Sequence, residues 1–203
     1  MLIKSINLYT LEELDPAIKE KVLNRHRDID VDGNWYDFVY EQWIDKLNSL
    51  GYKEASIHFS GFWSQGDGAC FDAKPDLKIL RLKKGMKFRP IDHLIRNDYL
   101  YGKIEGYSSH YCHERTRSFQ IYDQLANISK NQSILITELE DLIEKDRLSL
   151  CQQIYSDLEK EYEYLTTDEH VAETLIEADF LFQVNGDPEP TTANLNQQEA
   201  GLC

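Results

Sequence analysis

A glycine-rich turn flanked by large aromatic residues is the part of the sequence best suited to bind a ligand. The stretch HFSGFWSQGDGACFD holds Asp67 between Gly66 and Gly68. Glycines permit positive φ angles, and successive backbone N–H groups around such a turn can bind an anion. Gln65 can add an amide contact and Trp63 a stacking surface. The same residues are typical of a plain hairpin turn, and no phosphate-loop GK[ST] ending follows, so both interpretations stay open.

The segment HYCHER is the second place where chemistry-bearing side chains gather. His110, Cys112, His113 and Glu114 are potential zinc ligands, but their spacing is unusual for structural zinc and no second cluster exists. Cys112 with either histidine as base is a possible nucleophile, although neighbours in sequence rarely align for this. We favour a polar patch in which His110, His113 and Arg115 contact the glycine-rich turn or a partner.

A third candidate is the acidic turn DIDVDGN. Asp28, Asp30 and Asp32, followed by Gly33, match the first half of a helix–loop–helix calcium site. The twelfth position is Val39, where a bidentate glutamate is required. A turn that caps the following helix explains the same residues more simply. Calcium is therefore a weak candidate, and we predict no cofactor and no other metal.

The net charge of −14 is concentrated in one segment. Residues 1–132 contain 19 basic and 19 acidic side chains, whereas residues 133–190 contain 16 acidic and 3 basic ones. Such a field repels nucleic acid and attracts basic surfaces. A rigid row of carboxylates can imitate duplex DNA, although an ordinary solvated helix face has the same composition. The candidate surface consists of Glu138, Glu140, Asp141, Glu144, Glu159 and Glu163.

Hydrophobic periodicity predicts four helices around these candidates. Capping-box pairs at Thr10–Glu13 and Thr166–Glu169 predict helix starts, and Gly51 predicts the end of a helix from residue 35. That helix has Trp35, Phe38, Val39, Trp43, Ile44 and Leu47 as its apolar positions. A long helix over 131–165 has an apolar stripe made of Leu139, Ile143, Leu150, Ile154, Leu158, Tyr162 and Leu165.

Alternating and aromatic-rich segments predict the strands. ASIHFSGFW and ACFDA form a hairpin around the SQGDG turn, and LYGKIEGYSSH and TRSFQIYDQL supply two more strands. LIKSINLY and DFLFQV are further candidates near the two ends. The basic segment 74–90 is compatible with a strand, a short helix or a loop, and IDHLIRNDY predicts a short helix.

The element order predicts an α+β fold, with an antiparallel sheet of about four to six strands covered by helices. A long helix near the C-terminus is followed by a short one. We expect one domain over residues 1–186 and a disordered, polar tail over 187–203.

Composition restricts the setting of the protein. No apolar run approaches the length of a membrane helix, and the N-terminus lacks the hydrophobic region of a signal peptide. Cys70, Cys112, Cys151 and Cys203 are scattered, without a CxxC pair, so reduced thiols in a cytosol are expected.

The motif FSGFWSQGDGACF resembles one found in small, uncharacterised proteins of bacteriophages and prophages. The stretches LEELDPAIKEKVLNRHRD, WYDFVYE and LEKEYEYLTTDEHVAETL are similar to the helical parts of that family, so the resemblance covers most of residues 10–184. Segments 74–97 and beyond 186 are not matched. The resemblance implies a phage or mobile-element origin and a cytoplasmic location, and it implies no activity.

No combination of residues supplies a nucleophile, a base and an oxyanion site together, so the sequence favours a non-enzymatic function. We expect an acidic binding protein of phage origin that inhibits or masks a host component with a basic surface, such as a defence or nucleic-acid-handling protein. It is not expected to bind nucleic acid or membranes directly. The alternatives are the antitoxin of a toxin–antitoxin pair, and a small nucleotide- or ligand-binding enzyme that uses the SQGDG and YCHER segments.

Overall fold

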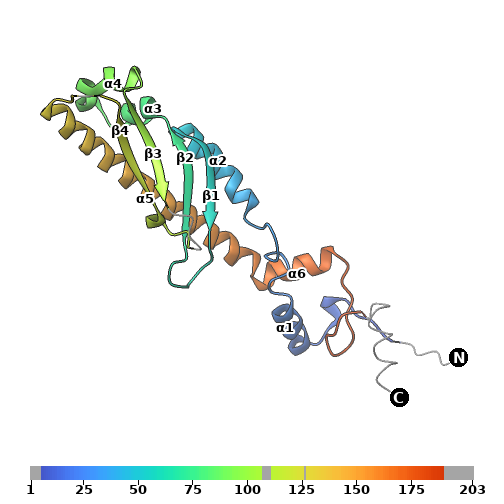
Figure 1. The fold of residues 1–203 in the computed structure, drawn as a ribbon. Helices are drawn as coiled ribbons and strands as arrows, with labels where there is room; N and C mark the ends of the chain where they lie inside the picture. The colour runs from blue at the N-terminus through green and yellow to red at the C-terminus, as the bar shows by residue number, and fades with distance from the viewer. Residues whose placement is uncertain (1–5, 107–110, 126, 190–203) are drawn as a thin grey trace, which may run out of the picture. The chain divides into compact units, whose positions relative to one another are not determined.

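The computed structural model describes residues 6–106, 111–125 and 127–189, and Figure 1 shows the course of the chain. The chain divides into two compact units. The terminal unit combines residues 1–35 with 162–203, and the central unit consists of residues 36–161. Within the described part of the chain, no helix combines the length and apolar character needed to cross a membrane.

The terminal unit is held together by a small helical core. It contains the 3-10 turn η1 (Leu11–Glu13) and the helices α1 (Pro16–Arg25) and α6 (Asp168–Glu177). Apolar side chains from both ends of the chain bury against one another here, which joins segments about 150 residues apart. They are Leu11, Leu14, Val22, Leu23, Val171, Leu175 and Phe182.

The first predicted helix starts later than expected. The N–H of Thr10 does donate to Glu13 Oε2 at 2.9 Å, but this pair closes only the single turn of η1. The backbone is extended at Leu14, and Asp15 then caps α1 by accepting from the N–H of Ala17. The prediction of one continuous helix from residue 11 is therefore wrong. The helix starts instead after Asp15, which is a stronger N-cap than Thr10 because Pro16 follows it at the first helical position.

The two terminal strand predictions reduce to single bridges. Tyr9 and Phe182 exchange backbone hydrogen bonds, and Phe182 also bridges to Pro188. Residues 1–5 of the first predicted strand lie outside the described residues. Asp187, the first residue of the predicted tail, takes part in a turn, because its carbonyl oxygen accepts from the N–H of Gln183, and its carboxylate pairs with Arg25. Residues 190–203 lie outside the described part of the chain.

The central unit begins with α2 (Asp37–Leu50), which ends as predicted at Gly51. Gly51 has φ +106°, a left-handed conformation that suits glycine at a helix end. Val39, Trp43 and Leu47 form the buried side of this helix. Phe38, however, is 64% exposed, so its predicted place in the apolar stripe is wrong.

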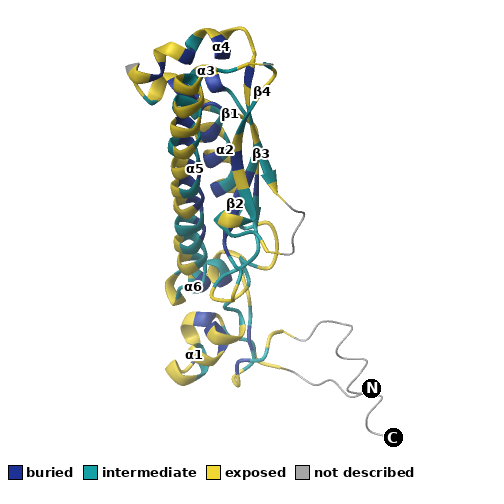
Figure 2. Cartoon of the chain, turned by 60° about the vertical axis from the view of Figure 1, so that its left-hand side comes forward, coloured by how far each residue is buried: buried dark blue, intermediate teal, exposed yellow. Residues whose placement is uncertain are grey.

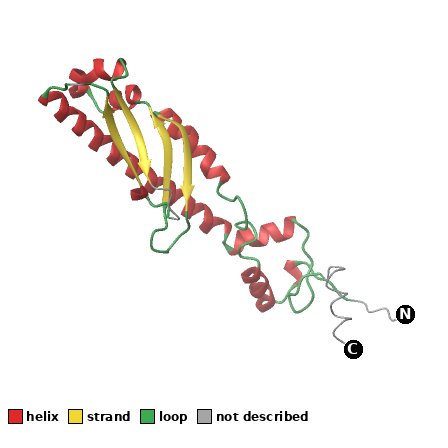
Figure 3. Cartoon of the chain, in the orientation of Figure 1, coloured by secondary structure: helices red, strands yellow, loops and turns green. Residues whose placement is uncertain are grey.

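Four strands follow in two antiparallel pairs. The first pair is β1 (Tyr52–Phe59) with β2 (Ala69–Pro75), and the second is β3 (Leu100–Gly106) with β4 (Arg117–Asp123). Figure 3 shows the strands lying side by side, but β2 and β3 share no hydrogen-bond ladder, so the described residues form two two-stranded sheets. The α+β class and the antiparallel pairing are confirmed. A sheet of four to six strands is wrong, because among the described residues the two ends of the chain contribute only isolated bridges, and side chains rather than a ladder join the two hairpins.

The basic segment 74–90, left open by the sequence, is helical after the end of β2: it contains α3 (Leu77–Lys83) and most of the 3-10 helix η2 (Met86–Ile91). The short helix predicted after it is confirmed as α4 (Asp92–Arg96). Asp76 caps α3 by accepting from the N–H groups of Lys78 and Ile79. Together these helices bury Leu77, Leu80, Phe88, Ile91, Leu94 and Ile95, which ties them to the core.

The long helix is confirmed as α5 (Lys130–Leu165), and the short α6 follows it. Ser129 and Gln132 cap its start reciprocally, since each bonds the other's backbone N–H. Figure 2 shows α5 running along the strands with its buried residues turned toward them. Five residues of the predicted stripe are buried, and Arg147 and Cys151 join them unexpectedly; the buried set is Leu139, Ile143, Arg147, Leu150, Cys151, Ile154 and Leu158. Thr167, not Thr166, caps α6 by accepting from His170 N.

Candidate recognition site

The loop of residues 60–68 between β1 and β2 is fixed by its own polar groups. The carboxylate of Asp67 accepts from the N–H of Ser64 at 2.8 Å, and the N–H of Asp67 donates to Ser64 O at 3.1 Å. Ser60 N–H donates to Gly68 O across the base of the loop. The Asp67 side chain therefore occupies a backbone donor that a bound anion would need, and it closes the turn instead.

The loop packs against the segment that follows β3, about 50 residues further along the chain. A Cβ atom on Gly66 would lie 2.5 Å from the ring of Tyr111, and one on Gly68 would lie 2.6 Å from the Cα of His113. The N–H of Cys112 donates to Ser60 Oγ at 3.1 Å. The SQGDG and YCHER segments thus lie together, and the two glycines allow the close contact.

The loop presents Trp63, whose side chain is 71% exposed and whose φ is +66°. A positive φ is uncommon outside glycine and costs conformational energy, which the surrounding structure must supply. The neighbouring Phe62 is held between Phe59 and Tyr155, with ring centroids 4.7 Å and 5.5 Å away, and it lies 5.3 Å from the ring of Trp63. Trp63 is thus an aromatic surface on a rigid support. Gln65 is exposed in the same loop.

His113 has a local structural role. It precedes the 3-10 turn η3 (Glu114–Thr116), and its Nδ1 accepts from the N–H of Arg115 at 3.1 Å. While Nδ1 accepts this hydrogen bond, it is not available to a metal. Arg115 itself is exposed, and His110 lies outside the described residues.

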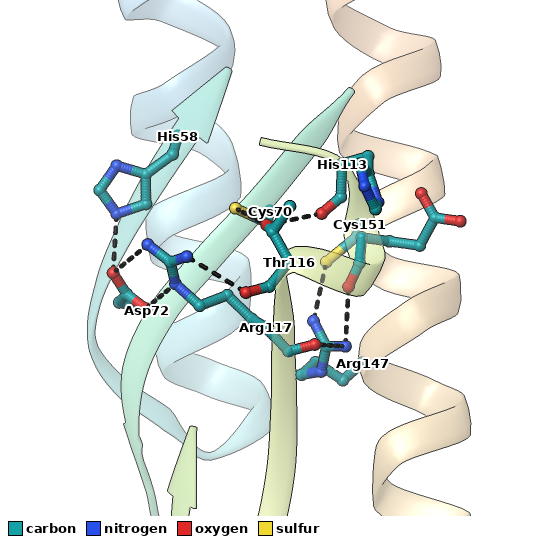
Figure 4. Close-up of polar contacts among 9 residues, drawn as sticks. His58, Cys70, Asp72, His113, Thr116, Arg117, Arg147 and Cys151 are labelled. Atoms are coloured by element: carbon teal, nitrogen blue, oxygen red, sulfur yellow. Dashed lines mark hydrogen bonds and ion pairs between the residues drawn. The ribbon is translucent and has the colours of Figure 1, made fainter. Parts of the chain in front are cut away.

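A polar cluster next to this segment joins the two hairpins (Figure 4). Arg117 of β4 donates from Nε to Asp72 Oδ1 of β2 at 2.7 Å, and His58 Nε2 of β1 lies 2.9 Å from Asp72 Oδ2. Burial raises the pKa of the Asp72 carboxyl, but hydrogen bonds and charge from Arg117, with a smaller contribution from His58, outweigh it and the pKa is lowered. Asp72 is thus held as a carboxylate that crosslinks three strands.

The close approach of residues 116 and 117 explains a glycine in β3. A Cβ atom on Gly106 would lie 2.3 Å from Thr116 O and 2.4 Å from Arg117 Cδ, so neither the neighbouring backbone nor the arginine side chain leaves room for one. Beside this cluster lies an open groove of about 900 Å³. Its lining is polar and comes from all four strands and η3: His58, Asp72, Lys103, Ile104, Glu105, Gly106, Arg115, Thr116, Arg117, Ser118 and Gln120.

Arg147 of α5 holds the same segment from the helix side (Figure 4). Its side chain is fully buried and makes a two-point contact with Glu144, at 2.7 Å for both nitrogens. It also donates to the carbonyl oxygens of Glu114 and Arg117, at 2.9 Å and 2.7 Å. A buried cation is tolerated here because all these acceptors converge on it.

Two of the predicted acidic surface residues serve the fold. Glu144 also accepts from the N–H of Phe119, and Glu140 accepts from the N–H of Ile121 at 2.6 Å. These N–H groups belong to β4, so the helix carboxylates cover the edge of that strand. The row of carboxylates along α5 is consequently shorter than the sequence indicated.

The remaining acidic candidates differ in their surroundings. Glu138 pairs with Lys87, and Asp141 is exposed. Glu159 is half-buried near the Trp63 loop, and Glu163 is exposed in the terminal unit. An uninterrupted imitation of duplex DNA therefore finds less support than a local acidic patch.

The three aspartates of the calcium candidate have different surroundings in the fold. Asp30 pairs with His170 at 2.9 Å and accepts a hydrogen bond from Thr174, both on α6, while Asp28 and Asp32 are exposed. Throughout residues 6–106, 111–125 and 127–189, no three histidine, cysteine or acidic side chains are grouped so that they could hold a metal. Cys70, Cys112 and Cys151 are free thiols, and burial raises the pKa of Cys151 to about 12.

A family model described as "Domain of unknown function (DUF8835)" matches residues 35–168. The chain belongs to the DUF8835 family. The match includes the loop of residues 60–68, the polar cluster and all of α5, and it agrees with the expected membership of an uncharacterised family. Searches of curated proteins and of solved structures produced no match.

The polar side chains that hold the site together in this DUF8835 member were not among the residues predicted from its sequence. His58, Asp72 and Arg117 lie on three different strands, and their pairing depends on how the hairpins meet. Arg147 gave a usable signal, since it occupies an apolar-stripe position of α5 four residues after Ile143 and four before Cys151. A charged residue at such a position indicates a buried partner.

Proposed function

We propose that the protein is an acidic binding protein of phage origin that masks a basic surface of a host protein, with the loop of residues 60–68 as its recognition element. The observation that carries the proposal is Trp63, exposed at 71% on a loop that is fixed from several sides. Large aromatic residues on rigid supports are the usual anchors of protein interfaces, because they bury much area and lose little conformational entropy on binding.

The charge distribution supports a basic partner. The excess acidic charge lies in residues 133–190, which include the part of α5 that contacts the loop through Tyr155. Complementary charge raises association rates and disfavours wrong partners. The resemblance of the FSGFWSQGDGACF motif to phage proteins supports the proposed origin.

The test is capture of partners from bacterial lysate by the full chain, at low and at high salt, compared with Trp63→Ala. We expect a basic protein that is retained at low salt, released at high salt and lost with Trp63→Ala. Phe38→Ala is the matched control, because Phe38 is an aromatic side chain of similar exposure elsewhere on the central unit. Equal capture by Trp63→Ala would contradict the proposal. If the captured protein were a toxin encoded by a neighbouring gene, the result would support the antitoxin alternative.

A second candidate function is binding of a small polar ligand in the groove beside the polar cluster. The specific observation is that His58, Arg115 and Arg117 line one open groove next to the recognition loop. Native mass spectrometry of the purified chain tests it. A mass increment that disappears in Arg115→Ala would favour this candidate, and an unaltered mass in ligand-rich extract would contradict it.

A further inference from the structure

An aromatic and acidic patch at the recognition loop indicates the chemistry of the partner. The patch consists of Phe62, Trp63, Asp67, Tyr155 and Glu159. Tyr155 and Glu159 are one helical turn apart on α5, so their side chains lie on the same face. The ring of Tyr155 contacts Phe62, which in turn contacts Trp63.

One carboxylate of the patch comes from the loop and the other from α5. Asp67 is fixed next to Trp63 by its bond to the N–H of Ser64, and only Oδ2 is used in that bond. The pKa of the Tyr155 hydroxyl is raised by burial first, and then by the negative charges of Glu159 and Asp67. The negative charges of Asp67 on the loop and Glu159 on α5 therefore both reach the Tyr155 side chain.

We infer that this patch binds an arginine side chain of the partner, stacked on the ring of Trp63 and paired with Glu159 and Asp67. A cation over an indole face is attracted by the ring's quadrupole, and tryptophan is the best of the aromatic residues for this. Arginine suits the patch better than lysine, because its planar guanidinium stacks on a ring while its N–H groups still bond carboxylates. This inference rests on the proposed function and specifies the partner's contact residue.

The inference can be tested on the full chain with three small probes. The probes are acetyl-Gly-X-Gly-amide peptides in which X is arginine, lysine or citrulline, the last being a neutral analogue of arginine. The readout is the indole Nε1–H signals of the ¹⁵N-labelled protein, whose three tryptophans are Trp35, Trp43 and Trp63. Trp43 is buried and donates to Asp157, so it serves as an internal reference.

We expect the arginine peptide to shift the Trp63 signal, the lysine peptide to shift it less, and the citrulline peptide to leave it in place. Glu159→Gln should weaken arginine binding by about two- to five-fold, as expected for one solvent-accessible ion pair. Asp45→Asn is the control, since Asp45 is an exposed acid on α2, outside both the patch and the candidate acidic surface, and should not alter binding.

Three outcomes would overturn the inference. They are equal shifts with the citrulline and arginine peptides, an unchanged affinity for the arginine peptide in Glu159→Gln, and a Trp63 signal that stays fixed at saturating arginine peptide. These results are distinguishable from failure of the proposed function. If lysate capture still depends on Trp63, the function stands without the arginine contact, whereas capture that is independent of Trp63 removes the function itself.

Discussion

At the scale of single residues, the two glycines of the recognition loop have a steric role. Gly66 has φ +93°, and both Gly66 and Gly68 contact the segment 111–113 too closely for a Cβ atom. We expect Gly66→Val and Gly68→Val each to destabilise the protein by about 1–3 kcal/mol, because overpacking forces the backbone to move. Denaturant unfolding measures this. Gln65→Ala in the same loop should change stability by less than about 0.5 kcal/mol, and valine variants as stable as the parent would contradict the packing.

The carboxylate of Asp72 makes a pH-dependent contribution to stability. Its folded pKa is lowered, so the contribution is complete above the unfolded value of 3.8 and is lost as the pH falls through the lower folded pKa. Asp72→Asn should remove this contribution, so that the variant is less stable than the parent at neutral pH and the difference shrinks in acid. Urea unfolding at pH 7 and near pH 3 measures both values. A stability difference that stays constant with pH would contradict the role assigned to Asp72.

At the scale of elements, α5 stabilises the strands through charged side chains as well as through its apolar stripe. Arg147→Met should destabilise the protein by about 3 kcal/mol or more, because the Glu144 carboxylate loses its buried partner and two carbonyl groups lose their donor. Lys145→Met, two residues away and exposed, is the control and should have little effect. Thermal unfolding compares the two variants, and equal stability would contradict the stabilising role assigned to the Arg147 contacts.

The role of the Glu140 carboxylate in covering the edge of β4 can be tested separately. Glu140→Lys should leave the N–H of Ile121 without its acceptor and expose part of the strand edge. We expect a loss of about 1–3 kcal/mol and a greater tendency to associate, measured by unfolding and by light scattering. Asp141→Lys changes the same charge one position along the helix and should do neither. A soluble, fully stable Glu140→Lys variant would show that the edge is covered in another way.

At the scale of the whole molecule, the acidic surface must be tested with residues that the fold does not use. Charge reversal at Glu140 or Glu144 would disturb β4 and would confuse loss of binding with loss of structure. Reversal of Asp141 and Glu159 to lysine should weaken capture of a basic partner and reduce its dependence on salt, while the unfolding midpoint stays nearly unchanged. Unchanged capture by the doubly reversed variant would remove charge complementarity from the proposed function.

The sequence by itself determined the elements whose signals are local. The apolar stripe predicted α5 within one residue of its start, Gly51 marked the end of α2, and alternating residues marked the hairpin of β1 and β2 and the two further strands β3 and β4. These signals are reliable because helix periodicity, a left-handed helix end and strand alternation depend on neighbours within a few residues. The class of the fold follows from the order of such elements.

Only the tertiary structure decided which side chains meet. It paired Arg117 with Asp72 across the two hairpins, buried Arg147 against the carbonyl groups of Glu114 and Arg117, and used Glu144 to cover a strand edge. Each of these contacts joins residues 25 or more positions apart, so no local pattern contains it. The same long-range packing fixed Gly66 and Gly68 against the segment 111–113, and it thereby turned a glycine-rich stretch into a rigid loop that presents Trp63.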